Sequence, residues 1–80
     1  MKTIAVTQQD IDRGVNAGPY KCALALALRR SFGCREGDVR VTRLNAVVRT
    51  RVFPLPPEAT QFIHDFDHRR PVQPFSFGID

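Results

Sequence analysis

The chain has 80 residues, of which 42% are hydrophobic and 25% are charged, a balance typical of a small globular protein. A hydrophobic core of this size only just suffices for stability, so we expect a single domain over residues 1–80. The longest apolar run, residues 22–28, is far shorter than the roughly 20 residues that a membrane-spanning helix needs. The first residues lack the pattern of a signal peptide, so the sequence predicts a soluble cytoplasmic protein without membrane contact.

Arginine dominates the charge of the chain. Twelve Lys and Arg residues stand against eight Asp and Glu, for a net charge of +4, and ten of the twelve are Arg. Residues 20–53 hold eight basic residues and only two acidic ones. Because the guanidinium group binds carboxylates and phosphates through paired hydrogen bonds, this segment indicates an anionic partner. The alternative is a basic surface that only keeps the protein in solution.

The chain begins with a predicted strand and a short helix. Ile4 and Val6 alternate with small or polar residues, which is typical of a strand with one buried face. Thr7, followed three residues later by Asp10, resembles the capping box that opens a helix. The glycines that follow keep this helix short, and Ile11 and Val15 are its expected core contacts.

A buried second helix is predicted next. Pro19 is expected to begin it, because proline is well tolerated in the first helical turn. The alternating Ala and Leu of residues 22–28 favour a helix over a strand, since both are strong helix formers. Gly33 is expected to end the helix just beyond Arg29 and Arg30.

The arginine-rich segment is predicted to form a β-hairpin. Apolar residues alternate through residues 39–41 and resume at residues 48–52, after a turn near Asn45. In such a hairpin the alternate side chains project together away from the core: Arg40, Thr42, Arg49 and Arg51. Like charges on neighbouring strands repel, so an anionic partner would stabilise this cluster.

A third helix and a last strand complete the predicted fold. Pro57 suits the first turn of a helix, and apolar residues follow at helical spacing: Ala59, Phe62, Ile63 and Phe66. Phe75 and Phe77 alternate in the final strand. The element order β-α-α-β-β-α-β predicts an α+β fold, a small, mostly antiparallel sheet with helices packed on one face.

Neither catalysis nor metal binding is indicated. Cys22 and Cys34 are too far apart for a redox or zinc motif, and Cys22 is expected in the core. His64 and His68 have the spacing that places two imidazoles on one metal, but a solvent-exposed helix face is the simpler expectation. No nucleophile–base arrangement and no glycine-rich phosphate loop is present. We therefore expect no enzyme activity, no cofactor and no metal.

Four stretches carry a resemblance to known proteins: VTQQDIDRG (6–14), CALALALRR (22–30), LPPEATQFIHDFD (55–67) and PVQPFSF (71–77). They resemble small phage and prophage proteins, and among these the anti-CRISPR inhibitors of type I-C CRISPR surveillance complexes. The resemblance implies a protein that binds Cas subunits stoichiometrically and stops the complex from engaging target DNA. The basic charge departs from the acidic, DNA-mimicking pattern common among such inhibitors, which implies docking on an acidic Cas surface instead.

The predicted contact residues are the arginines of the hairpin and those near it: Arg40, Arg43, Arg49, Arg51, Arg29, Arg30 and Arg35. A Cas subunit is the expected partner, bound by a monomer or a homodimer. Direct nucleic-acid binding by a small regulatory phage protein is the main alternative, since an arginine-rich hairpin also fits phosphates. A structural phage component is a third.

Overall fold

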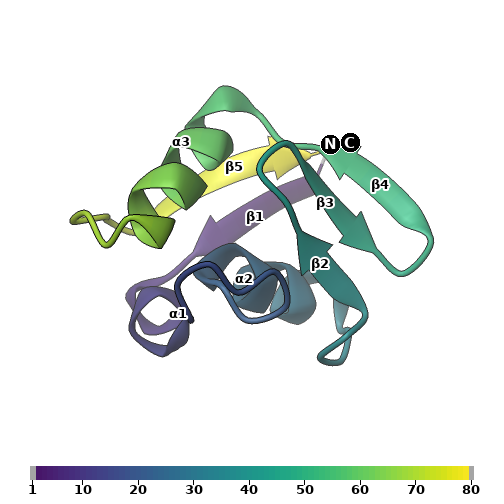
Figure 1. Cartoon of the computed structure of the whole chain (residues 1–80). Coiled ribbons are helices and arrows are strands. Elements are labelled where there is room, and N and C mark those ends of the chain that lie inside the picture. The colour runs from purple at the N-terminus through teal and green to yellow at the C-terminus, as the bar shows by residue number, and fades with distance from the viewer. Residues whose placement is uncertain (1, 80) are drawn as a thin grey trace.

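Residues 2–79 are described by a computed structural model, which confirms the α+β class and its antiparallel strand pairing. The observed order is β-α-α-β-β-β-α-β, with one strand more than the sequence indicated. The strands divide into two sheets (Figure 1). The first sheet joins the two ends of the chain, because β1 (Lys2–Val6) pairs with β5 (Phe75–Ile79) in the register Ile4 to Phe77.

The second sheet is a three-stranded meander instead of the expected hairpin. Its strands pair antiparallel in chain order: β2 (Val39–Val41), β3 (Asn45–Val48) and β4 (Arg51–Pro54). The first turn ends at Asn45, whose N–H donates to the Thr42 hydroxyl at 3.2 Å. The strand expected through residues 48–52 is interrupted at Arg49, whose φ of 57° is incompatible with a strand.

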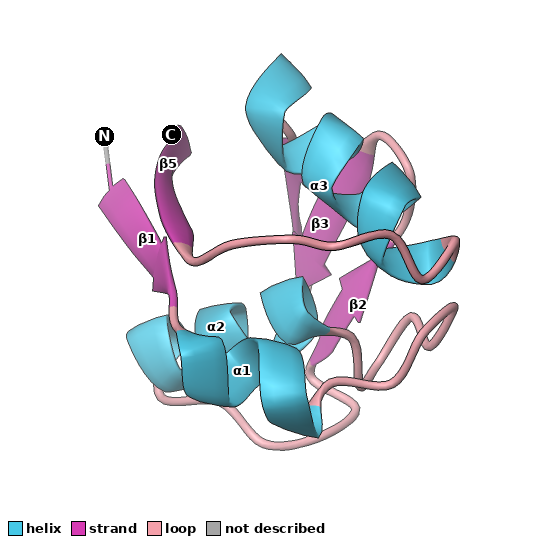
Figure 2. Ribbon diagram, turned by 90° about the vertical axis from the view of Figure 1, so that its left-hand side faces the viewer, coloured by secondary structure: helices cyan, strands magenta, loops and turns pink. Residues whose placement is uncertain are grey.

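Three helices pack around these sheets: α1 (Gln8–Arg13), α2 (Ala23–Phe32) and α3 (Pro57–Asp67). Figure 2 shows the sheets on opposite sides of the molecule, with α1 and α2 along the base. As expected, α2 is the buried helix, and it contacts α1, β1 and β2. Its Leu24 and Leu28 are fully buried, and three alanines beside them let the neighbouring elements approach closely.

Most helix ends lie where local sequence signals predicted them. Gly33 ends α2 with φ 65°, and Pro57 stands in the first turn of α3, both as predicted. Pro19 does not begin α2. The segment before α2 instead forms a turn in which Cys22 N–H donates to the Gly18 carbonyl at 2.9 Å, and the helix begins at Ala23. That turn also leaves Val15 half exposed, so the expected core contact of Val15 is wrong.

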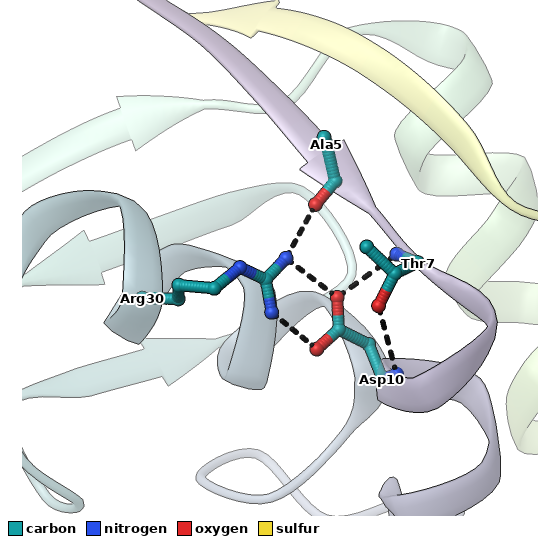
Figure 3. Close-up of polar contacts among 4 residues, drawn as sticks. All are labelled: Ala5, Thr7, Asp10 and Arg30. Carbon is teal, nitrogen blue, oxygen red and sulfur yellow. Dashed lines mark hydrogen bonds and ion pairs between the residues drawn. The ribbon is translucent and has the colours of Figure 1, made fainter.

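An ion pair between buried Asp10 and half-exposed Arg30 joins α1 to α2 (Figure 3). Asp10 is 4% exposed and is the single buried charged side chain among residues 2–79. Arg30 donates from Nη1 to Asp10 Oδ1 at 2.7 Å and from Nη2 to Oδ2 at 2.8 Å. Nη2 also donates to the Ala5 carbonyl of β1 at 2.8 Å. One guanidinium group therefore links α2 to both β1 and α1.

The predicted capping box completes this network. Thr7 N–H donates to Asp10 Oδ2 at 2.9 Å, and Asp10 N–H donates to Thr7 Oγ1 at 3.2 Å. Burial alone would raise the pKa of Asp10, but the hydrogen bonds from Arg30 and Thr7 outweigh it and hold the pKa below its ordinary value. The charged form of Asp10 is therefore the form that stabilises the fold.

We expect this network to make the protein acid-sensitive. Because the pKa of Asp10 is lower in the folded chain, its contribution is complete well above the unfolded pKa of about 4 and is lost as pH falls through the folded pKa. Asp10→Asn should lower the free energy of unfolding by about 2 kcal/mol at neutral pH and flatten its decline below about pH 5. Urea denaturation over a pH series measures both effects.

Asp12→Asn is the matched control for that experiment. Asp12 is exposed on the same helix and accepts a hydrogen bond only from Gln8. Asp12→Asn should keep the acid dependence of the wild-type chain. Parallel stability curves for wild type and Asp10→Asn would contradict the assigned role of Asp10.

A second fold prediction concerns Gly14, which allows α1, α2 and α3 to meet. A Cβ atom on Gly14 would lie 2.7 Å from Ala23 N, 2.9 Å from the Asp10 carbonyl oxygen and 2.9 Å from Phe66 Cζ. Two of these atoms belong to backbone, which cannot move aside without shifting a helix. Gly14→Ala should therefore lower the free energy of unfolding by about 1–3 kcal/mol. Gly33→Ala serves as a comparison, because its added Cβ atom meets no other atom within 4 Å and strains only the positive φ at that position. A Gly14→Ala variant as stable as wild type would contradict the close packing at Gly14.

Candidate interaction surface

The arginine-rich part of the surface is the second sheet with its two turns, residues 39–54, here termed the basic meander. It contains four arginines and no Asp or Glu. The pairing of Arg40 with Val47, and of Val47 with Val52, forms one row across its outer face. Arg40 and Val52 are exposed, whereas the neighbouring inner row of Val41, Ala46 and Phe53 is buried.

Arg40, Arg49 and Arg51 do not project together, which corrects the expectation from the hairpin. Arg51 pairs with buried Val48 and lies on the inner side at the sheet edge, with its guanidinium carbon 4.8 Å from the centre of the Phe53 ring. Arg49 occupies the turn, where its Nε lies 3.9 Å from Asp38 Oδ2. The extra turn after β3 changes the alternation, so side chains expected on one face are divided between the face, the edge and the turn.

Arg43 occupies the opposite turn of the meander, beside α3. It lines a groove of about 540 Å³ together with His64 and Asp67 of α3 and with His68, which follows the helix. A second hollow of about 270 Å³ continues from Arg43 and Asp67 toward buried Cys22. Arg43 and Arg40 are exposed, and within residues 2–79 neither has a carboxylate within 4.0 Å.

The three remaining predicted arginines lie outside the meander. Arg35 is exposed in the turn before β2, where its backbone N–H donates to Asp38. Arg30 is occupied by Asp10 and Ala5, so its role is structural. Arg29 is half-buried in the last turn of α2. The structure therefore does not form one continuous surface from the seven predicted residues.

Two exposed apolar side chains belong to the basic meander and were missed from the sequence. Leu44 is 68% exposed in the first turn, and Val52 is 60% exposed on the outer face. The hairpin prediction placed Val52 with the core residues, because the turn at residues 49–50 was not recognised. Single exposed apolar residues are common on protein surfaces, and these two add apolar area to a segment otherwise rich in arginine.

The histidines and cysteines lie outside the basic meander. His64 and His68 are exposed as expected, with ring centres 4.3 Å apart. Within residues 2–79 no group of three potential metal ligands comes together. Cys22 is 5% exposed, and burial raises the pKa of its thiol, while Cys34 is half-buried. No helix in the described part of the chain is long and apolar enough to cross a membrane.

We expect the unpaired arginines of the meander to add nothing to stability. Arg40→Gln combined with Arg43→Gln should leave the free energy of unfolding within about 0.5 kcal/mol of wild type, because both side chains are exposed and lack acidic partners. Arg30→Gln should lower it by about 2 kcal/mol, since buried Asp10 loses its counter-charge. Thermal denaturation followed by circular dichroism compares the two, and equal losses would show that Arg40 and Arg43 are structural.

Comparison with protein-family models, with curated protein sequences and with solved structures finds no match for this chain. Its function is therefore inferred from the charge, exposure and packing of the residues described above.

Proposed function

We propose that this chain is a non-enzymatic anti-CRISPR protein of the bacterial cytoplasm that binds a type I-C surveillance complex stoichiometrically. In this proposal the basic meander docks on an acidic surface of a Cas subunit and blocks the path of target DNA. The observation that supports it is the composition of that surface, with four arginines, no acidic residue and the exposed side chains of Leu44 and Val52. The choice of a CRISPR complex rests on the resemblance in the sequence.

The exposed apolar side chains favour a protein partner over nucleic acid. Burying Val52 and Leu44 against a protein surface releases water from both, a gain of about 25 cal/mol for each Å² of apolar area. The surrounding arginines then add specificity and speed of association through charge complementarity. A phosphate backbone would use the arginines alone and leave the apolar side chains in solvent.

The aromatic residues support the same choice. Proteins that bind single-stranded nucleic acid commonly stack bases on exposed aromatic rings. Here Phe53, Phe62, Phe66 and Phe77 are buried, and Phe32 and Phe75 pack against the core. Tyr20 is 41% exposed, but it lies in the loop before α2, outside the meander.

Inhibition is measured by fluorescence anisotropy of a labelled target duplex mixed with a type I-C surveillance complex. The wild-type chain should abolish duplex binding at about one molecule per docking site. Arg40→Glu combined with Arg43→Glu should restore duplex binding, because the reversed charges face an acidic Cas surface. Both arginines are exposed and unpaired, so the fold should survive, which circular dichroism verifies.

Arg69→Glu combined with Arg70→Glu is the matched control, since it changes the net charge equally at the end of α3, where both side chains are exposed. The control should inhibit like wild type, apart from a small effect of total charge. Inhibition by the meander variant equal to that of the control would remove the meander from the interface. Direct binding of the duplex by the protein alone would favour the nucleic-acid alternative. If the wild-type chain leaves duplex binding by the surveillance complex unchanged, the proposal is contradicted.

A further inference from the structure

A second basic site lies between α1 and α2, outside the basic meander. It is a pocket of about 450 Å³ lined by side chains from both helices and the turn after α2: Gln9, Arg13, Leu26, Arg29, Arg30 and Cys34. Gln9 and Arg13 are one turn apart on α1, and Leu26, Arg29 and Arg30 have the same-face spacing on α2. The two helices thus present three guanidinium groups to one hollow.

Only two of these three positive charges are uncompensated. Arg30 is neutralised by Asp10, whose carboxylate also lines the pocket and is occupied by Arg30 and Thr7. Among residues 2–79, Arg13 and Arg29 have no carboxylate within 4.0 Å. The pocket therefore holds a local charge of about +2.

Arg29 reaches the pocket with the outer part of its guanidinium group. Its Nε is buried from solvent and has no hydrogen-bond partner, the one side-chain atom in this condition within the described chain. A ligand in the open hollow would therefore be contacted by Nη1 or Nη2 of Arg29, not by Nε.

We propose that this pocket binds a phosphate group. A phosphate monoester carries a charge between about −1.5 and −2 at neutral pH, which matches the two free guanidinium groups. Its tetrahedral oxygens accept hydrogen bonds from several directions, as from Arg13 on one helix, Arg29 on the other and the Gln9 amide. A planar carboxylate is satisfied by a single guanidinium fork and leaves the second charge unmatched. The pocket is larger than a phosphate ion, which leaves space for the group that the phosphate is attached to.

This site is independent of the proposed inhibition of a surveillance complex. It shares no residue with the basic meander, and each surface has its own test. The phosphate proposal survives if the meander binds no Cas subunit, and the proposal for the meander survives if the pocket between α1 and α2 binds no phosphate.

The test uses the full chain labelled with ¹⁵N and titrated with inorganic phosphate, with chloride at equal ionic strength as the blank. The backbone amides around Gln9, Arg13 and Arg29 should shift with phosphate and not with chloride. Arg29→Gln should weaken phosphate binding about tenfold, as the loss of one charge-assisted interaction predicts. Arg13→Gln should do the same, and because Arg13 is exposed this variant keeps the fold if Arg29→Gln does not.

Arg40→Gln is the control, since it removes the same charge from the meander and should leave phosphate affinity within about twofold of wild type. Parallel titrations with adenosine monophosphate and with a short duplex identify the source of the phosphate. If adenosine monophosphate binds more tightly than the duplex, the ligand is a small phosphorylated molecule. If the duplex binds more tightly, and Arg13→Gln and Arg29→Gln weaken duplex binding as they weaken phosphate binding, the ligand is a nucleic-acid backbone. Absence of specific amide shifts, or equal losses in Arg29→Gln, Arg13→Gln and Arg40→Gln, would overturn the proposal.

Discussion

The ion pair between Asp10 and Arg30 is the contact on which the arrangement of the first 30 residues depends. It fastens the start of α1 to the end of α2, and the same guanidinium group holds the Ala5 carbonyl of β1. A chain of 80 residues has a small core, so a polar junction between three elements sets orientations that apolar packing alone leaves loose. Its position also fixes how Arg13 and Arg29 lie relative to each other, because α1 and α2 form the walls of the pocket of about 450 Å³ between them.

The features that were predictable from the sequence are those specified by residues close together in the chain. The capping box of Thr7 and Asp10, the stop at Gly33 and the apolar spacing of α3 each depend on a few adjacent side chains. The pairing of Asp10 with Arg30 was not predictable, because both residues had satisfactory local explanations as a helix cap and a helix C-terminal cation. Contacts across 20 positions need the packing of whole helices before they can be recognised.

The basic surface was predicted in composition but not in geometry. Residues 47–52 read VVRTRV, with no glycine or proline, so nothing local marks the turn that Arg49 makes. That turn separates Arg49 and Arg51 from Arg40 and exposes Val52. The arginines consequently have different environments: ion pairs for Arg30 and Arg49, an aromatic ring for Arg51 and open solvent for Arg40. Only those in solvent or beside an unfilled pocket remain available to a ligand.

The pairing of β1 with β5 has a consequence for the synthesis of the protein. Ile4 and Val6 are synthesised well before their strand partner, residues 75–79. At synthesis rates of about 5–20 residues per second, the roughly 70 residues between the two strands take about 4–14 seconds, during which β1 has an open edge and uncovered apolar side chains. Arginine residues between the two strands keep the unfinished chain charged, and proline residues interrupt its apolar stretches. Both features disfavour association between nascent chains. The sheet then closes within one molecule, and the two ends of the described chain finish side by side (Figure 1).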